Sequence, residues 1–509
     1  MATRKKSGLA VRMPLFLLIC GLASLSMVVP VLHALSLGDE AVARSFFYSA
    51  VIGIVAVVLV ALAKGNRPSH RRPLVQLFAL LATFALLPIY LALPFYDVLR
   101  TTTYLNAYLE MVSALTTTGF ETFAPDRLAP TLHLWRAQVA WMGGFLMWVA
   151  ASSILAPMGL GGFEVTARGE PGRVVAGAEM RDGADPRVRL LRVARTLTPV
   201  YAGLTGTVCI LLLLAGEEPL VAVIHAMSVM ATSGISPIGG VEHARTGFGG
   251  EAILFLFMFF ALSRLTFLSD TVTVGERRLD RDPEFRIGIF LVLGVPAVIL
   301  LRHWLGAYEV TMQSDFLAAT RALWGSLFTV MSFLTTTGFV SADWGNAQMW
   351  SGLETSEIIL MGLALIGGGV ATTAGGVKLL RVFALYLNGL REMERLVHPS
   401  SVSGARLNGR RIQTNGAFIA WVFFMLFALF LAVVTVLLAA QAVSFEQALL
   451  LSVASLSTTG PLVGVATETS LWLSEFEMGV KITLCVAMVL GRLETLAIVA
   501  LLTPNLWRS

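Results

Sequence analysis

The chain has 509 residues, of which 56% are hydrophobic and only 14% are charged. A soluble globular domain carries about 25% charged residues, so this composition excludes that class. The formal net charge of +5 is small for this length and comes from Lys and Arg in a few segments, so no nucleic-acid partner is expected. The three cysteines stand singly in apolar stretches, which indicates neither a disulfide framework nor a clustered metal site.

Apolar stretches long enough to cross a bilayer recur along the whole chain. A membrane-spanning helix needs about 20 mainly apolar residues. The pattern therefore predicts an all-α polytopic membrane protein with ten spanning helices. We expect these helices at 13–35, 46–63, 74–96, 134–157, 198–215, 251–269, 285–302, 355–376, 415–440 and 477–502.

Basic residues are divided unevenly between the segments that connect these spans. Of the 37 Lys and Arg residues, 28 fall in six segments that lie on one face of the membrane if all ten spans form. Cytoplasmic loops are enriched in Lys and Arg. We therefore place this face and both termini in the cytoplasm. The remaining four connections, 97–133, 216–250, 303–354 and 441–476, then face outward.

Each outward connection contains a short apolar helix candidate followed by a polar strand that holds a glycine. A serine stands six positions before the glycine in the first three connections (Ser113, Ser228 and Ser332), and Ala454 takes that place in the fourth. The shared register indicates an internal repeat. The candidate filter residues are Thr116, Thr117, Thr118 and Gly119 in the first strand; Ala231, Thr232, Ser233 and Gly234 in the second; Thr335, Thr336, Thr337 and Gly338 in the third; and Ser457, Thr458, Thr459 and Gly460 in the fourth.

A single strand of this kind would usually indicate close helix packing, because small and hydroxylated residues serve that purpose in membranes. Four copies in one register, each between two spans, favour a shared function. An alkali ion that leaves water needs a ring of oxygens, and the carbonyls of extended strands supply one. Non-helical backbone at membrane depth is tolerated only where it lines a cavity or is buried in protein. We therefore expect the four strands to converge on one pore axis.

The filter strands and two further segments resemble the Trk/Ktr/HKT superfamily of cation transporters, and most closely its TrkH branch. One segment is the glycine-rich turn with its basic exit, 367–381. The other is the last span at 491–494 with the ending 503–508. Two leading spans before the first repeat also fit this branch, as does Pro461 after the fourth glycine.

The resemblance implies four membrane-pore-membrane repeats in a pseudo-fourfold array around a central pore, preceded by two extra transmembrane helices. It also implies a homodimer in the bacterial plasma (inner) membrane, contact with lipid, and a cytoplasmic nucleotide-binding ring of the TrkA type as regulatory partner. In the family, glycine at all four filter positions goes with potassium preference, and this chain has all four. The expected divisions are 1–73 for the leading helices, then 74–197, 198–284, 285–414 and 415–509 for repeats 1 to 4.

Two features below the filter are candidates for a gate. Arg492 lies within the last span, where a basic residue costs about 2.5–3.5 kcal/mol on insertion scales. It is either a fixed charge that impedes cation flow, as the resemblance also implies, or a salt-bridge partner of Glu494 or another carboxylate. The turn at 367–376 either unwinds into a loop across the inner pore or forms a kinked, tightly packed helix. Its candidate gate residues are Gly367, Gly368, Gly369, Gly375, Gly376 and Lys378, the last being either a gate charge or an anchor at the cytoplasmic end of the span.

The residues and the resemblance together predict potassium uptake by channel-like, gated conduction, with potassium as the substrate and no cofactor in this chain. An enzyme is not expected, because the seven histidines lack metal-ligand spacing. The sequence has no Walker-type phosphate loop, so nucleotide control would come from a partner. Two alternatives stay open within transport: symport coupled to protons or sodium, and less selective transport of potassium and sodium. A receptor or scaffold without conduction leaves the four equivalent strands unexplained.

Overall fold

The structure is a computed structural model of the chain. The predicted ends of two spans, at 264–269 and 495–502, and the ending 503–508 lie outside the described residues. The structure describes residues 13–64, 73–158, 160–163, 186–263, 282–305, 316–353, 355–398, 406–407, 410–411, 414–466 and 471–494.

Two leading spans form one side of the molecule. The first consists of α2 (Leu15–Ser26) and α3 (Val28–Ser36), and the second is α4 (Glu40–Lys64). Both α2 and α3 pack against α4, and α2 also contacts α5 of the first repeat. On α4, Leu59 and Leu62 are 60% and 72% exposed, which fits a helix surface that faces lipid.

Four groups of helices follow, each with a first long helix, a pore helix and a second helix; the pore helix is short in repeats 1, 2 and 4. Repeat 1 has α5 (Pro73–Val98), α6 (Tyr104–Leu115) and α7 (Pro130–Ala150), which continues through a π-helical turn, Ala151–Leu155, into α8 (Ala156–Met158). Repeat 2 has α10 (Pro186–Leu214), α11 (Pro219–Ala231) and α12 (Gly247–Met258). Repeat 3 has α13 (Pro283–Leu305), α14 (Phe316–Leu334), α15 (Trp344–Ser351), α16 (Ser356–Ile366) and α17 (Leu379–Val397). Repeat 4 has α18 (Thr414–Ala439), α19 (Phe445–Leu456), α20 (Leu462–Ala466) and α21 (Met478–Leu493).

The pore helices begin at ordinary helix-start signals. Thr103 caps α6 by accepting a hydrogen bond from the backbone of Asn106, and Ser444 caps α19 in the same way. Pro219 opens α11 at its first position, where the missing N–H costs nothing.

A two-residue antiparallel ladder, β1 (Arg406–Leu407) with β2 (Arg410–Arg411), is the strand pairing in the described residues. The fold is otherwise all-α.

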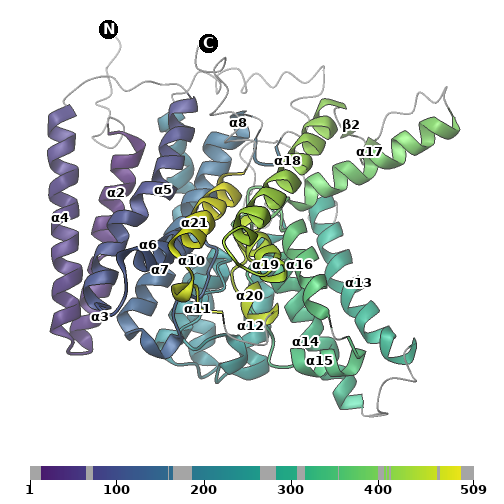
Figure 1. Ribbon diagram of the computed structural model, residues 1–509, viewed down its shortest axis with the longest axis horizontal. Coiled ribbons are helices and arrows are strands. Elements are labelled where there is room, and N and C mark those ends of the chain that lie inside the picture. Colours follow the sequence, from purple (N-terminus) through teal and green to yellow (C-terminus); the bar gives the residue numbers. More distant parts are fainter. Residues whose placement is uncertain are drawn as a thin grey trace, which may run out of the picture.

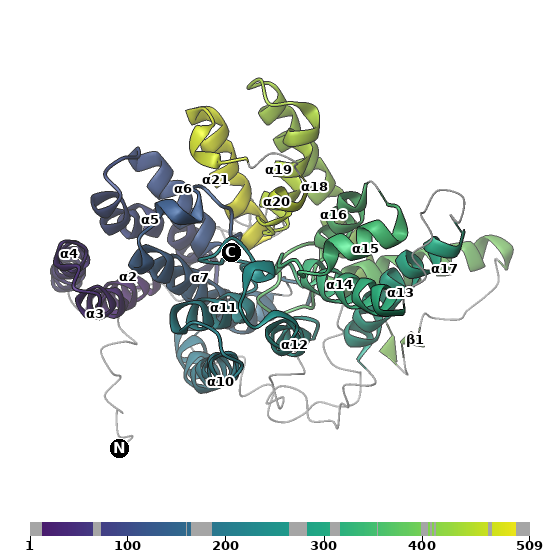
Figure 2. The same ribbon diagram turned by 90° about the horizontal axis from the view of Figure 1, so that it is seen from below.

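The four repeats surround a common centre. Figure 2 shows α5–α7, α10–α12, α13–α16 and α18–α21 as successive sectors, with α2–α4 outside the first sector. In Figure 1 α17 extends sideways from the bundle. The order of the sectors follows the order of the sequence. The expected all-α, pseudo-fourfold architecture with two leading helices is therefore the observed one.

Eight described helices are long and apolar enough to span a membrane, or up to nine if the bent pair α15 and α16 counts as one span. Seven of them match expected spans, and the eighth, α14, lies in a connection where only a short pore helix was expected. The span expected at 355–376 is wrong in its second half, because helix α16 ends at Ile366. In the span expected at 251–269, the described part is helical as far as Ala261, in an apolar helix that begins at Gly247.

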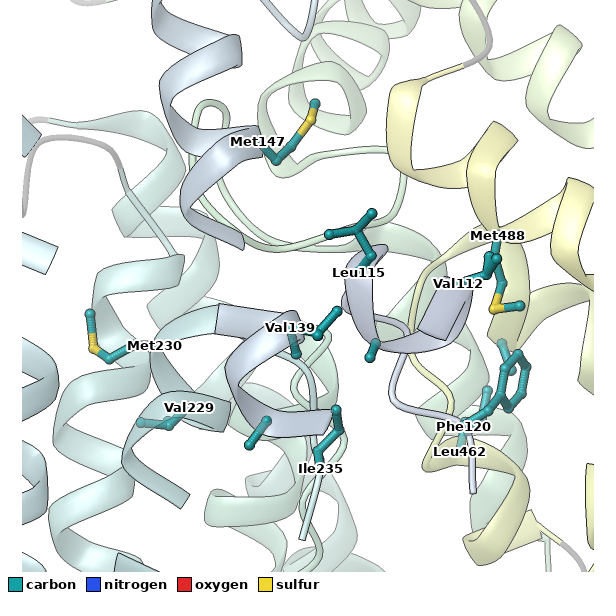
Figure 3. Close-up of a cluster of buried hydrophobic side chains, with 14 of the residues drawn as sticks. Val112, Leu115, Phe120, Val139, Met147, Val229, Met230, Ile235, Leu462 and Met488 are labelled. Carbon is teal, nitrogen blue, oxygen red and sulfur yellow. The ribbon is translucent and has the colours of Figure 1, made fainter. Parts of the chain in front are cut away.

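Buried apolar side chains hold the pore loops against the surrounding helices. Figure 3 shows Val112 of α6 beside Met488 of α21, and Leu115 of α6 between Val139 and Met147 of α7 in this view. All five are buried. Since lipid tails are as apolar as these side chains, close packing rather than removal from water stabilises such contacts in a membrane.

Candidate functional site

Each filter strand begins where a pore helix ends, at Leu115, Ala231, Leu334 and Leu456. Two residues before each filter glycine stands a threonine with left-handed backbone. A β-branched residue rarely adopts this conformation, which costs about 1–3 kcal/mol. Its recurrence at one register in four repeats shows that the strands share one backbone shape. The four are Thr117 (φ 57°), Thr232 (φ 51°), Thr336 (φ 56°) and Thr458 (φ 55°).

The strands also share their hydrogen bond to the pore helix. In each, the residue just before the glycine donates its N–H to the carbonyl five positions earlier. This bond ties the strand to the end of its pore helix. The bonds are Thr118 N to Ser113 O (2.8 Å), Ser233 N to Ser228 O (3.0 Å), Thr337 N to Ser332 O (2.8 Å) and Thr459 N to Ala454 O (2.8 Å).

In three of the strands a hydrogen bond between two side-chain hydroxyls also joins residues two positions apart. They join Thr116 to Thr118 (2.8 Å), Thr335 to Thr337 (3.0 Å) and Ser457 to Thr459 (3.3 Å). In the second strand Ala231 has no hydroxyl, and Ser233 bonds to Ser228 instead, at 3.1 Å.

The glycines join the strands into a closed ring. A Cβ on Gly119 would overlap the carbonyl of Ser233, and one on Gly234 would overlap the carbonyl of Thr337. A Cβ on Gly338 would lie 3.0 Å from the ring of Pro461, and one on Gly460 would overlap the first strand. Each glycine thus contacts the next strand, and the fourth returns to the first. The four strands converge on one axis, as expected from their register.

The fourth strand breaks the symmetry. Gly460 donates its N–H to the carbonyl of Thr118 at 2.6 Å, and the carbonyls of Thr459 and Gly460 accept hydrogen bonds from the start of α20. Gly460 also lacks the positive φ of the other three filter glycines. The carbonyl rings are therefore only approximately fourfold.

The segment between α16 and α17 is a loop rather than a kinked helix. Its neck is closed by hydrogen bonds from Val377 N to the carbonyl of Leu365 (2.9 Å) and from Lys378 N to the carbonyl of Ile366 (2.8 Å). Its tip lies against the filter, because Gly375 N donates to Thr336 Oγ1 at 2.7 Å. A Cβ on Gly375 would overlap the carbonyl of Ser457. The loop therefore contacts the third and fourth filter strands directly.

Arg492 and Lys378 are both buried and both bind this loop. Arg492 is 3% exposed and donates from Nη1 to the carbonyl of Thr373 at 2.7 Å. Lys378 donates from Nζ to the carbonyl of Ala374. The two side chains, with Gly375, line one small cavity. Two buried basic side chains therefore lie beside the loop that contacts the filter strands.

The salt bridge considered between Arg492 and Glu494 is not the observed one. Glu494 pairs with Arg381, whose Nη2 lies 2.6 Å from Glu494 Oε2. Arg381 is fully buried, and its guanidinium carbon lies 3.7 Å from the ring centroid of Phe423. Glu494 therefore neutralises Arg381, which was quoted only as part of the basic exit and given no role.

Three further buried charged residues near the filter were not identified from the sequence. Arg136 of α7 forms an ion pair with Glu110 of α6, and its Nη2 donates to the carbonyl of Phe120 at 3.4 Å. Glu251 of α12 is 2% exposed and binds the segment after the third strand. The sequence holds one weak indication of these residues, because Arg136 and Glu251 each lie 17 positions after a filter glycine.

Acidic residues at the outer side mainly bind the protein. Glu217 Oε2 accepts from Thr246 Oγ1 at 2.8 Å, and Glu218 pairs with Arg245 at 2.5 Å. Glu242 lies beyond the second strand, and burial raises the pKa of its carboxyl group. These contacts favour a structural role for Glu217 and Glu218, and the raised pKa of Glu242 disfavours its charged form.

Known proteins resemble this chain in sequence over most of its length. A family model described as "TrkH: Cation transport protein" matches residues 282–508. The chain is 30% identical over 410 residues to the "Trk system potassium uptake protein TrkH" of Halomonas elongata, a match that covers 79% of this chain and 80% of that protein. The chain belongs to the TrkH family. The TrkH-family protein of the same description from Escherichia coli K12 is 28% identical over 413 residues, with 80% of each chain covered.

The solved structure of a TrkH-family protein is similar throughout. The crystal structure of the potassium transporter TrkH from Vibrio parahaemolyticus superposes with a TM-score of 0.79 at 25% identity, and the match covers 99% of this chain and 100% of that one. The expected membership of the TrkH branch is confirmed. The chain is a multi-pass membrane protein, and its relatives are transport proteins.

Proposed function

We propose that this chain takes up potassium ions across the bacterial inner membrane by channel-like, gated conduction. The observation that carries the proposal is the closed ring of four strands, in which each glycine contacts the next strand. The TrkH-family relatives from Halomonas elongata and Escherichia coli, which are described as potassium uptake proteins, support potassium as the substrate. A dehydrated potassium ion would exchange its water shell for carbonyl oxygens at 116–119, 231–234, 335–338 and 457–460.

The loop at 367–378 is the gate of this pathway. It closes on the filter through Gly375 and is tied down by Arg492 through Thr373. Opening requires the loop to move, which removes its contacts with the filter and separates it from Arg492. Because α17 begins at Leu379, directly after the loop, a force applied to α17 reaches the loop without an intermediate element.

We also propose a topology and an assembly for this protein. Both termini lie in the cytoplasm, the protein forms a homodimer, and a TrkA-like nucleotide-binding ring regulates it. The description of the relatives as members of a Trk system supports partners of some kind. The division into two leading helices and four repeats stays as proposed, with the first helix of each repeat beginning at Pro73, Pro186, Pro283 and Thr414.

Purified full-length protein in liposomes tests the function. We expect uptake of potassium and rubidium to exceed uptake of sodium, and a proton or sodium gradient to leave potassium uptake unchanged at fixed membrane potential. Equal sodium and potassium fluxes would contradict selectivity. Potassium accumulation driven by a proton or sodium gradient would establish symport instead.

A further inference from the structure

The first filter strand has a hydrogen bond from its outer end to a serine of its pore helix, and the third strand lacks the matching bond. In the first strand the backbone N–H of Phe120 donates to Ser113 Oγ at 2.8 Å. The matching hydroxyl in the third, Ser332 Oγ, is buried and has no hydrogen-bond partner among the described residues. The first and third strands are otherwise nearly identical in sequence. Something else must hold the third strand where it leaves the filter.

Glu251 makes that connection from a different repeat. Its Oε2 accepts from Trp324 Nε1 and from Ser341 Oγ, both at 2.7 Å, and its Oε1 accepts from the backbone N–H of Ala342, also at 2.7 Å. Trp324 lies on pore helix α14, and Ser341 and Ala342 follow the filter glycine Gly338 by three and four residues. One carboxylate therefore holds the pore helix and the returning chain of repeat 3 together.

The energetics indicate that this carboxylate is more than a packing group. Glu251 is 2% exposed, and no Lys or Arg within the described part of the chain forms an ion pair with it. Burying a charge costs several kcal/mol unless hydrogen bonds satisfy it. Three bonds of 2.7 Å are the short, charge-assisted kind that fix geometry. An apolar residue would fill the same space at lower cost but could not fix the position of the Ser341–Ala342 backbone.

The first repeat has a charged residue at the same register. Arg136 on α7 contacts the carbonyl of Phe120, the residue after the filter glycine of strand 1. Figure 2 shows repeats 1 and 3 on opposite sides of the centre, so charges from second helices support two facing strands. This matched placement argues that the supports belong to the filter rather than to one local packing problem.

We propose that Glu251 is a selectivity-positioning residue, which sets the distance of the third strand's carbonyls from the pore axis by bracing the chain at Ser341 and Ala342. The inference rests on the proposed potassium uptake. It adds that repeat 2 controls the filter geometry of repeat 3. A brace with this role affects the potassium-to-sodium flux ratio, whereas a merely structural carboxylate affects only stability.

The test uses the full-length protein in liposomes and compares Glu251→Gln with the matched surface variant Glu446→Gln, whose glutamate is exposed at the start of α19. Glutamine has one amide oxygen in place of two carboxylate oxygens, so it can accept either from Trp324 and Ser341 or from the Ala342 N–H, but not from both sets. We expect Glu251→Gln to lower the potassium-to-sodium flux ratio about tenfold, the size expected for loss of a charge-assisted hydrogen bond. Glu251→Asp should restore part of the ratio, and Glu446→Gln should leave it unchanged.

A second variant covers the case in which Glu251→Gln does not fold. Trp324→Phe removes the indole N–H together with part of the ring that packs against Phe248 and Phe255. We expect it to lower the flux ratio by about threefold, less than the glutamine variant, because two of the three bonds to Glu251 remain. A wild-type flux ratio in a folded Glu251→Gln protein, or in Trp324→Phe if the former fails to fold, would overturn this inference alone. Absence of potassium preference in the wild-type protein would overturn the proposed function and this inference with it.

Discussion

At the scale of single residues, the filter glycines are fixed by contact as well as by backbone angle. Gly119 has φ of 72°, and a Cβ there would overlap the carbonyl of Ser233 on the neighbouring strand. Any side chain at this position therefore displaces an oxygen that we assign to the ion. Its effect should appear in ion preference before it appears in folding.

Replacement of Gly119 by serine tests this contact. We expect Gly119→Ser to lower the potassium-to-sodium flux ratio about tenfold, which corresponds to about 1.4 kcal/mol of lost discrimination. The matched control is Gly203→Ser, because a Cβ at Gly203 on α10 meets nothing within 4 Å. Unaltered ion preference in folded Gly119→Ser would remove this strand from the filter.

Arg492 tests the barrier below the filter. Its side chain donates a hydrogen bond to the carbonyl of Thr373 in the loop, and we propose that its charge opposes cations. We expect Arg492→Gln to raise potassium flux several-fold. The control is Arg395→Gln on α17, whose exposed pair with Glu392 contributes about 0–1 kcal/mol and lies away from the pore. A stability loss in Arg492→Gln without increased flux would mean that the residue only holds helices together.

At the scale of secondary-structure elements, the glycine-rich turn was predicted better than the helices beside it. Its glycines lower helix propensity, and the chain leaves the helix at Gly367. The extension of the span to 376 was wrong because hydropathy alone does not detect where helix ends. Helix α14 is also longer than the short pore helix that was expected, and it is apolar enough along its length to count as a candidate membrane span.

Gly375 tests the loop as an element. A Cβ at Gly375 would overlap the carbonyl of Ser457, so we expect Gly375→Ala to push the loop away from the filter and raise potassium flux. The matched control, Gly362→Ala on α16, places its Cβ in open space and should stabilise the helix by roughly 0.5–1 kcal/mol without a change in flux. Flux equal to wild type in both variants would show that this loop does not limit conduction.

At the scale of the whole molecule, the fourfold repeat could be predicted from the sequence, but the side-chain contacts between repeats could not. Four glycine strands in one register predicted convergence because internal repeats place equivalent segments around one axis. The pairing of Arg381 with Glu494 joins residues 113 positions apart, and Glu251 binds residues 73 to 91 positions away. Periodicity and spacing describe one element at a time, so they cannot reveal contacts between repeats.

The central claim is that four unequal strands form one potassium site. The most direct measurement is anomalous diffraction from crystals of this protein grown in rubidium, which replaces potassium and can be located by its own scattering. The account predicts rubidium on the axis, coordinated by backbone oxygens from all four strands, and its loss when sodium replaces it. Rubidium bound elsewhere, or a filter axis without ions in rubidium, would contradict the account.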